Sequence, residues 1–176
     1  MKNIRYEIKN FKGFILGIGR FDDLFLKQII KNDDISFSIL TNSSLDGEYV
    51  KKSSKLVDRK KNKEISVRKL RKVFKKNRPN YMIIDINEVY SYLKTFIKDS
   101  LYITNKKIYI YTSNKDIDIN EIYKLYKRYN KNIVIDGDYI ILDMEGYKNN
   151  NIKNFIYYIV DTFVSFYNFI SNVLTS

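Results

Sequence analysis

The sequence predicts an α/β fold, a three-layer sandwich in which helices cover both faces of a mostly parallel sheet. Short apolar runs typical of buried strands alternate along the chain with amphipathic segments typical of helices. Strands that alternate with helices form parallel sheets, because a helix makes each return crossing. Near the end of this pattern, two apolar runs flank an Asp-Gly-Asp turn at 136–138, which predicts a closing antiparallel hairpin.

The first part of the chain supplies two strands with a helix between them. Residues 13–19 (GFILGIG) form an apolar run that ends in glycine and predict the first strand. Asp22 and Asp23 follow, and they suit the first turn of a helix, where carboxylates interact favourably with the helix dipole. Residues 35–40 (ISFSIL) then alternate between apolar and polar side chains and predict the second strand.

The later part of the chain continues the alternation. Residues 81–86 (YMIIDI) predict a buried strand, which a helix follows from about 88 to 98, and residues 106–113 predict an alternating strand. Either Asp116 or Asp118 can cap the next helix. That helix would turn four side chains inward: Ile122, Leu125, Tyr126 and Tyr129.

Missing residue types narrow the chemistry that this chain can perform. The 176 residues include no Cys, which excludes disulfides and thiolate nucleophiles, and no His, which excludes a Ser-His triad. Lys, Asn, Ile and Tyr make up about half of the chain and Ala is absent. This bias is typical of an AT-rich genome, so lysine content alone says little about function. No apolar signal segment follows the N-terminus, which predicts a cytoplasmic protein.

The order of elements over roughly residues 12–146 resembles the class I methyltransferase fold, a Rossmann-like domain that binds S-adenosylmethionine. FILGIGRFDD (14–23) corresponds to the glycine-rich first loop of that family, and RPNYMIIDI (78–86) to its fourth strand. The last helix and the hairpin are similar to the family's final elements. The resemblance implies that Gly17, Gly19 and Asp85 line a pocket for S-adenosylmethionine.

The sequence departs from the methyltransferase pattern at most of the cofactor positions. The loop continues as Arg20-Phe21-Asp22, where the family has a third glycine. Thr41-Asn42 stands where an acid would bind the ribose hydroxyls, and no catalytic motif follows Asp85. The cofactor motifs are therefore degenerate, and the two glycines are expected chiefly to permit a sharp turn.

The positive charge of the chain is concentrated in a basic segment, residues 51–78. It holds 14 Lys or Arg and two acids, whereas the rest of the chain holds 18 of each sign. Ser66 can cap a helix that runs to Pro79 and packs Val67, Leu70, Val73 and Phe74 on the sheet. The expected contacts with RNA or another acidic partner are Arg59, Lys60, Lys61, Arg68, Lys69, Arg71, Lys72, Lys75, Lys76 and Arg78. A solvated loop and an anionic membrane surface are the alternatives.

The C-terminal part of the chain predicts a separate amphipathic helix over 152–175, after a linker near 148–151. Its apolar residues follow an unbroken 4-3 spacing: Ile152, Ile156, Ile159, Phe163, Phe166, Ile170 and Val173. Polar residues interrupt it too often for a membrane span. Three roles are possible for this helix: docking on the preceding domain, formation of a homodimer or binding of a protein partner, and membrane contact.

These observations predict two parts, a domain at 1–148 and the linker and helix at 149–176. The predicted function is that of a non-enzymatic binding or scaffold protein without a bound cofactor, whose basic segment contacts an acidic partner. An active S-adenosylmethionine-dependent methyltransferase and a peripheral membrane protein are the alternative functions.

Overall fold

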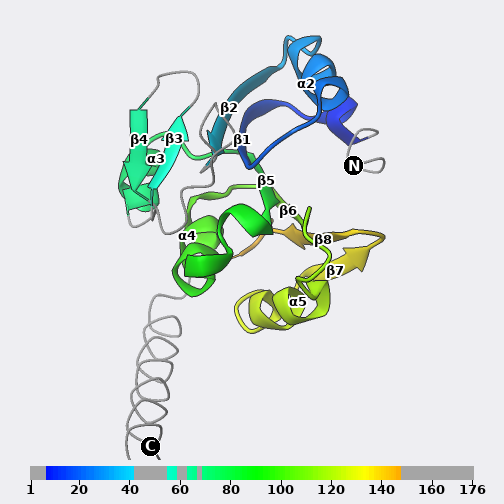
Figure 1. Ribbon diagram of the computed structural model, residues 1–176. Helices are drawn as coiled ribbons and strands as arrows, with labels where there is room; N and C mark the ends of the chain where they lie inside the picture. Colours follow the sequence, from blue (N-terminus) through cyan, green and yellow to red (C-terminus); the bar gives the residue numbers. More distant parts are fainter. Residues whose placement is uncertain (1–6, 42–54, 59–62, 67–68, 148–176) are drawn as a thin grey trace, which may run out of the picture. The chain divides into compact units, whose positions relative to one another are not determined.

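The computed structural model describes residues 7–41, 55–58, 63–66 and 69–147 (Figure 1). These residues form an α/β fold around one eight-stranded sheet with the strand order β4-β3-β2-β1-β5-β6-β8-β7. Its centre is parallel and consists of β2 (Ile35–Thr41), β1 (Gly13–Ile18), β5 (Tyr81–Asp85) and β6 (Lys107–Tyr111). The predicted α/β class and its parallel core are confirmed, and the sheet is consistent with a Rossmann-like fold.

An antiparallel hairpin closes one side of the sheet, as predicted. It is formed by β7 (Ile133–Asp136) and β8 (Tyr139–Asp143), and β8 pairs antiparallel with β6. The turn between them has two residues, Gly137 and Asp138, with Gly137 at a φ of 58°. Such turns require positive φ, which explains the glycine.

A second antiparallel pair, which the sequence did not predict, closes the other side of the sheet. It consists of β3 (Lys55–Asp58) and β4 (Lys63–Ser66), and β3 pairs with β2. Ser66 therefore ends a strand, and the prediction that it caps the basic helix is wrong. That helix, α3 (Leu70–Phe74), is shorter than predicted. Leu70 and Phe74 lie one turn apart on the same side of α3 and are buried, whereas Val73, which was predicted to pack on the sheet, is 47% exposed.

Helices pack on both faces of the sheet. On one face, η1 (Ile8–Asn10) and α2 (Asp23–Ile30) contribute Ile8, Phe25 and Ile29 to a core cluster that includes alternate residues of β1, β5 and β6. On the other face lie α3, α4 (Leu93–Ile103) and α5 (Ile119–Lys127). The α3 ring of Phe74 lies 6.1 Å from the Phe14 ring of β1, and a hydrogen bond between Ser100 and Tyr126 joins α4 to α5.

Two helix starts show how side chains set the boundaries. Asp22 caps α2 by accepting a hydrogen bond from the Phe25 N–H at 2.8 Å, and Asp118 caps α5 through Asn120. The helix predicted from about 88 begins only at Leu93. Before it lie two short 3₁₀ turns, η3 (Ile86–Glu88) and η4 (Tyr90–Tyr92), and Asp85 accepts from the Asn87 N–H at the first of them.

The described residues lie in one compact unit, Met1–Gly146, apart from Tyr147. The described residues end at 147, so they do not include the predicted linker, the predicted boundary at 148 or the predicted helix at 152–175. These remain predictions. Within the described ranges, no helix is long and apolar enough to cross a membrane.

Candidate functional site

The loop after β1 lies at the carboxyl end of the parallel strands, where open α/β sheets bind their ligands. From β1 the chain passes through α2 to β2 on one side, whereas β5 lies on the other side and leads through α4 to β6. The connections therefore diverge between β1 and β5. At such a switch point a ligand crevice would be bordered by Gly17, Gly19 and Asp85.

Gly17 lies beneath two aromatic rings. A Cβ atom at this position would lie 2.7 Å from Cε2 of Phe21 and 2.9 Å from Cζ of Phe37. Phe21 stacks on Phe25 with ring centroids 5.0 Å apart and meets Phe37 edge-on at 5.9 Å. The close approach of these rings requires a glycine here, and the rings occupy the space next to its backbone.

Gly19 is held between β2 and the end of β5. Its N–H donates to the Leu40 carbonyl at 2.9 Å, and its φ is 121°, which side chains with a Cβ rarely adopt. A Cβ atom at this position would lie only 2.6 Å from Cβ of Asp85 and 3.5 Å from Cγ of Glu88. Both the backbone conformation and the neighbouring side chains therefore require glycine.

Asp85 is a buried carboxylate whose hydrogen bonds are to the backbone. The residue is 3% exposed, and its Oδ1 accepts from the N–H groups of Asn87 at 3.1 Å and Ser113 at 3.2 Å. It thus ties the end of β5 to the loop after β6. Nearby, the hydroxyl of Tyr111 donates to the Arg20 carbonyl at 3.0 Å. Burial raises the pKa of Tyr111, and the negative charge of Asp85 adds to this effect.

The end of β2 completes this group of side chains. Thr41 is buried, and its hydroxyl donates to Oε2 of Glu88 at 3.5 Å. The structure thus brings together the three residues predicted for the cofactor, Gly17, Gly19 and Asp85. Phe21 and Phe37 fill the space beside Gly17, which no local sequence pattern predicts. Whether these residues bind S-adenosylmethionine stays a prediction.

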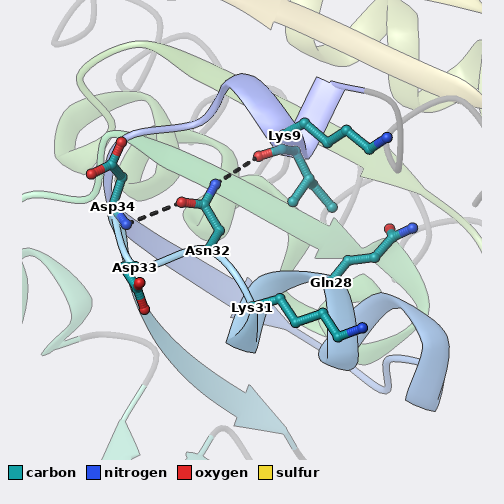
Figure 2. Close-up of a pocket in the computed structure, with 7 residues that line it drawn as sticks. Lys9, Gln28, Lys31, Asn32, Asp33 and Asp34 are labelled. Atoms are coloured by element: carbon teal, nitrogen blue, oxygen red, sulfur yellow. Dashed lines mark hydrogen bonds between the residues drawn. The ribbon is translucent and has the colours of Figure 1, made fainter.

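Two hollows lie at the opposite, amino end of the parallel strands. The larger, of about 480 Å³, is drawn in Figure 2 and is lined by Ile8, Lys9, Gln28, Lys31, Asn32, Asp33 and Asp34. Asn32 bridges its wall by donating to the Ile8 carbonyl and accepting from the Asp34 N–H. The smaller hollow, of about 280 Å³, includes Glu7 and Lys107. Both mix cations with carboxylates, so neither selects a ligand by a single sign of charge.

The described part of the basic segment turns its cations to the solvent. Leu70 and Phe74 of α3 are buried, whereas the surrounding cationic residues are exposed: Lys69, Arg71, Lys72, Lys75, Lys76 and Arg78. The other four predicted contacts, Arg59, Lys60, Lys61 and Arg68, lie outside the described residues. The predicted separation into an apolar and a basic face thus holds for this helix, except at Val73.

Two arginines of the basic segment contact α4. Nε of Arg71 lies 2.6 Å from Oδ1 of Asp99, whose side chain is 8% exposed. Burial raises the pKa of Asp99, although the positive charge of Arg71 acts in the opposite direction. The guanidinium groups of Arg71 and Arg78 lie 4.8 Å and 4.7 Å from the ring centroid of Tyr102. No local sequence pattern indicates Asp99 or Tyr102 as partners of these arginines, because both lie in another helix.

The residues described provide little for metal chemistry. Across these ranges, no group of three or more His, Cys, Asp or Glu side chains could hold a metal ion. The chemistry available at the carboxyl end of the sheet is that of the Asp85 carboxylate, the Thr41 hydroxyl and the Tyr111 phenol, which are already hydrogen-bonded to the protein. The exposed chemistry is cationic.

Comparisons of the chain with protein-family models, with curated proteins and with solved structures found no match.

Proposed function

We propose that the protein is a non-enzymatic binding or scaffold protein that holds RNA through its basic segment. The observation that carries this proposal is the pair of surfaces on α3. One side of this helix is buried against the sheet by Leu70 and Phe74, and the other presents six exposed cations between residues 69 and 78. A helix that is packed on the sheet on one side and densely cationic on the other is suited to binding a polyanion.

The side chains at the carboxyl end of the sheet support a non-enzymatic role. Phe21 and Phe37 lie against Gly17, and Asp85 lies against Gly19. A cofactor at the position that the methyltransferase resemblance implies would have to displace these side chains. The buried Asp85 carboxylate also accepts two backbone hydrogen bonds that any rearrangement would break.

The proposal is tested by the salt dependence of RNA binding. We expect the full chain to bind a single-stranded RNA oligonucleotide at low salt and to lose affinity as salt rises, because bound phosphates release counterions. The variant Lys69→Gln/Lys72→Gln/Lys76→Gln should bind more weakly. It should also lower the slope of log K against log salt by up to about 2, since each contact with single-stranded RNA contributes about 0.7.

A matched control separates a local surface from overall charge. Lys9, Lys27 and Lys31 are exposed on the face that carries η1 and α2, so Lys9→Gln/Lys27→Gln/Lys31→Gln removes the same charge elsewhere. This variant should bind RNA almost as the wild type does. Equal losses in the two variants, or wild-type affinity that is insensitive to salt, would contradict the proposal.

An active S-adenosylmethionine-dependent methyltransferase is the second candidate. It is favoured by the strand order around β1 and by the antiparallel hairpin after α5, which are consistent with the class I methyltransferase resemblance. Gly17, Gly19 and Asp85 would line the cofactor pocket. Calorimetric titration with S-adenosylmethionine distinguishes the candidates, because absence of heat at high micromolar ligand would count against the enzyme.

A further inference from the structure

We propose that the RNA-binding surface extends beyond the basic segment across α4 and α5, and that it binds the phosphate backbone of single-stranded RNA without stacking on its bases. This inference rests on the proposed function. It adds cations from two further helices to those of the basic segment, and it assigns the tyrosines among them the role of positioning these cations.

The helical layer of α3, α4 and α5 is strongly basic, whereas the opposite face is neutral. Residues 69–78, 93–103 and 119–131 together hold twelve Lys or Arg and two acids. One of these acids, Asp99, is buried and paired with Arg71. Residues 7–34, which include η1 and α2, hold five cations and five acids. Compositional bias toward lysine acts on both faces, so it does not explain this difference.

A row of cations and tyrosines connects the three helices. We call it the cation–tyrosine row, and it consists of Arg71, Arg78, Tyr102, Lys98 and Tyr129. Tyr102 of α4 lies beneath the two guanidinium groups, and Lys98, one turn earlier on α4, lies 5.9 Å from the ring centroid of Tyr129 beyond α5. The row therefore crosses the outer side of α4 from the basic segment to the end of α5.

Further cations flank the row on the same outer surfaces. Lys94 is exposed and lies one turn before Lys98, on the side of α4 opposite the buried Phe96 and Ser100. On α5, Ile122 and Tyr126 are buried, whereas Lys124 and Lys127 are exposed, as are Arg128 and Lys131 just after the helix. The surface thus offers many separated positive charges, as a chain of phosphates would require.

The tyrosines of the row are already covered by cations. Two guanidinium groups lie within 5 Å of the Tyr102 ring centre, so a nucleic-acid base could stack there only by displacing them. A guanidinium held over a ring keeps its outward N–H groups available, and these suit phosphate oxygens. The tyrosines are therefore positioning residues for the cations, and the backbone of the RNA supplies the contacts.

The test uses the full chain and two RNA probes of equal length, oligo(U) and oligo(A). The two probes should bind with affinities within about twofold and with the same salt slope, because their backbones are identical. Base stacking on the tyrosines would instead favour one probe, since stacking strength differs between bases. A preference of tenfold or more for oligo(A) would overturn the phosphate-only mode.

Three variants test the extension over α4 and α5. Lys94→Gln/Lys98→Gln/Arg128→Gln should weaken both probes by at least tenfold at low salt and lower the salt slope by about 2. Tyr102→Leu should weaken binding by releasing Arg78, whereas Tyr102→Phe, which keeps the ring, should bind as the wild type does. Thermal melting confirms that each variant is folded.

The outcomes separate this inference from the proposed function. If wild type binds and Lys69→Gln/Lys72→Gln/Lys76→Gln weakens it while the variant in α4 and α5 does not, only the extension is wrong. If wild type binds neither probe at low salt, both proposals are wrong. Binding to anionic lipid vesicles without binding to RNA would likewise overturn both.

Discussion

Gly19 is the residue at which the loop after β1 is least tolerant of substitution. Its φ of 121° and its contact with Asp85 each exclude a Cβ atom. We expect Gly19→Ala to destabilise the protein by about 3 kcal/mol or more, because backbone strain and a steric clash add together. The measurement is the free energy of unfolding in urea.

Gly146 provides a matched control for this prediction. It also has a positive φ, 74°, but no atom lies within 4 Å of its hypothetical Cβ. Gly146→Ala should therefore cost only about 1–2 kcal/mol, the strain of a left-handed residue. If the two substitutions lower the unfolding free energy by the same amount, contact with Asp85 does not contribute to the cost of Gly19→Ala.

The sequence indicated that Gly17 and Gly19 belong to a turn, but it could not indicate what lies against them. Asp85 is far from Gly19 along the chain, and contact between them depends on the pairing of β1 with β5. Phe21 and Phe37 are likewise brought over Gly17 by the pairing of β1 with β2. A local pattern reports the conformation of a loop, whereas the filling of a crevice depends on contacts between distant segments.

At the scale of secondary structure elements, the contact between α3 and α4 includes an ion pair whose arginine is partly solvated. The Arg71 side chain is 45% exposed and that of Asp99 is 8% exposed. Burial is the larger influence on Asp99 and raises its pKa above the ordinary value of 3.8. A raised pKa in the folded state means that the folded protein binds this proton more tightly than the unfolded chain does.

This contact predicts a specific pH dependence. The stability contributed by Asp99 should be fully present below pH 3.8, and it should be lost as pH rises through the higher pKa of the folded state. The difference in unfolding free energy between wild type and Asp99→Asn should therefore shift against the wild type over that range. Urea unfolding at several pH values measures it, and an opposite trend would mean that Arg71 outweighs burial.

Removing the arginine provides a second check on the same ion pair. Arg71→Met should destabilise the protein at pH 7 by about 1–3 kcal/mol, because it leaves a buried carboxylate without its charged partner. The double variant Arg71→Met/Asp99→Asn should recover much of that loss. A loss that persists in the double variant would point to the apolar part of the arginine instead.

The elements themselves were largely predictable, and the exceptions share a cause. Strands β1, β2, β5 and β6 and the closing hairpin were predicted because their apolar patterns are local. The pair β3–β4 was missed because its residues are mostly polar and charged, as befits strands at the border of a sheet. The late start of α4 was missed because two 3₁₀ turns precede it, and Asp85 caps the first of them through the Asn87 N–H.

At the scale of the whole molecule, buried tyrosines on both faces of the sheet should determine stability at alkaline pH. Burial raises the pKa of Tyr109 and Tyr111 on one face and of Tyr126 on the other above the ordinary 10.0. The folded state therefore keeps these protons when the unfolded chain releases them. Stability present below pH 10 should be lost as pH rises toward the folded-state values.

The expected loss is about 1.4 kcal/mol per pH unit for each such tyrosine. Unfolding measured between pH 9 and 11, together with phenolate absorbance, tests this expectation. Tyr126→Phe should reduce the slope of the unfolding free energy against pH by the contribution of one tyrosine. If the variant has the same slope as the wild type, Tyr126 is not a phenol that ionises only on unfolding.

The position of β1 at the centre of the sheet has a consequence for how the chain folds. The Phe14 N–H of β1 donates a hydrogen bond to the side-chain Oδ1 of Asn80, 66 residues away along the chain. The basic segment, with its 14 cations, lies entirely within the loop that closes when β1 meets β5. Hairpin β7–β8 can form locally and early, whereas this closure is long-range and works against mutual repulsion. The RNA that we propose as the partner would therefore also speed folding, because it would neutralise the basic segment while the central strands come together.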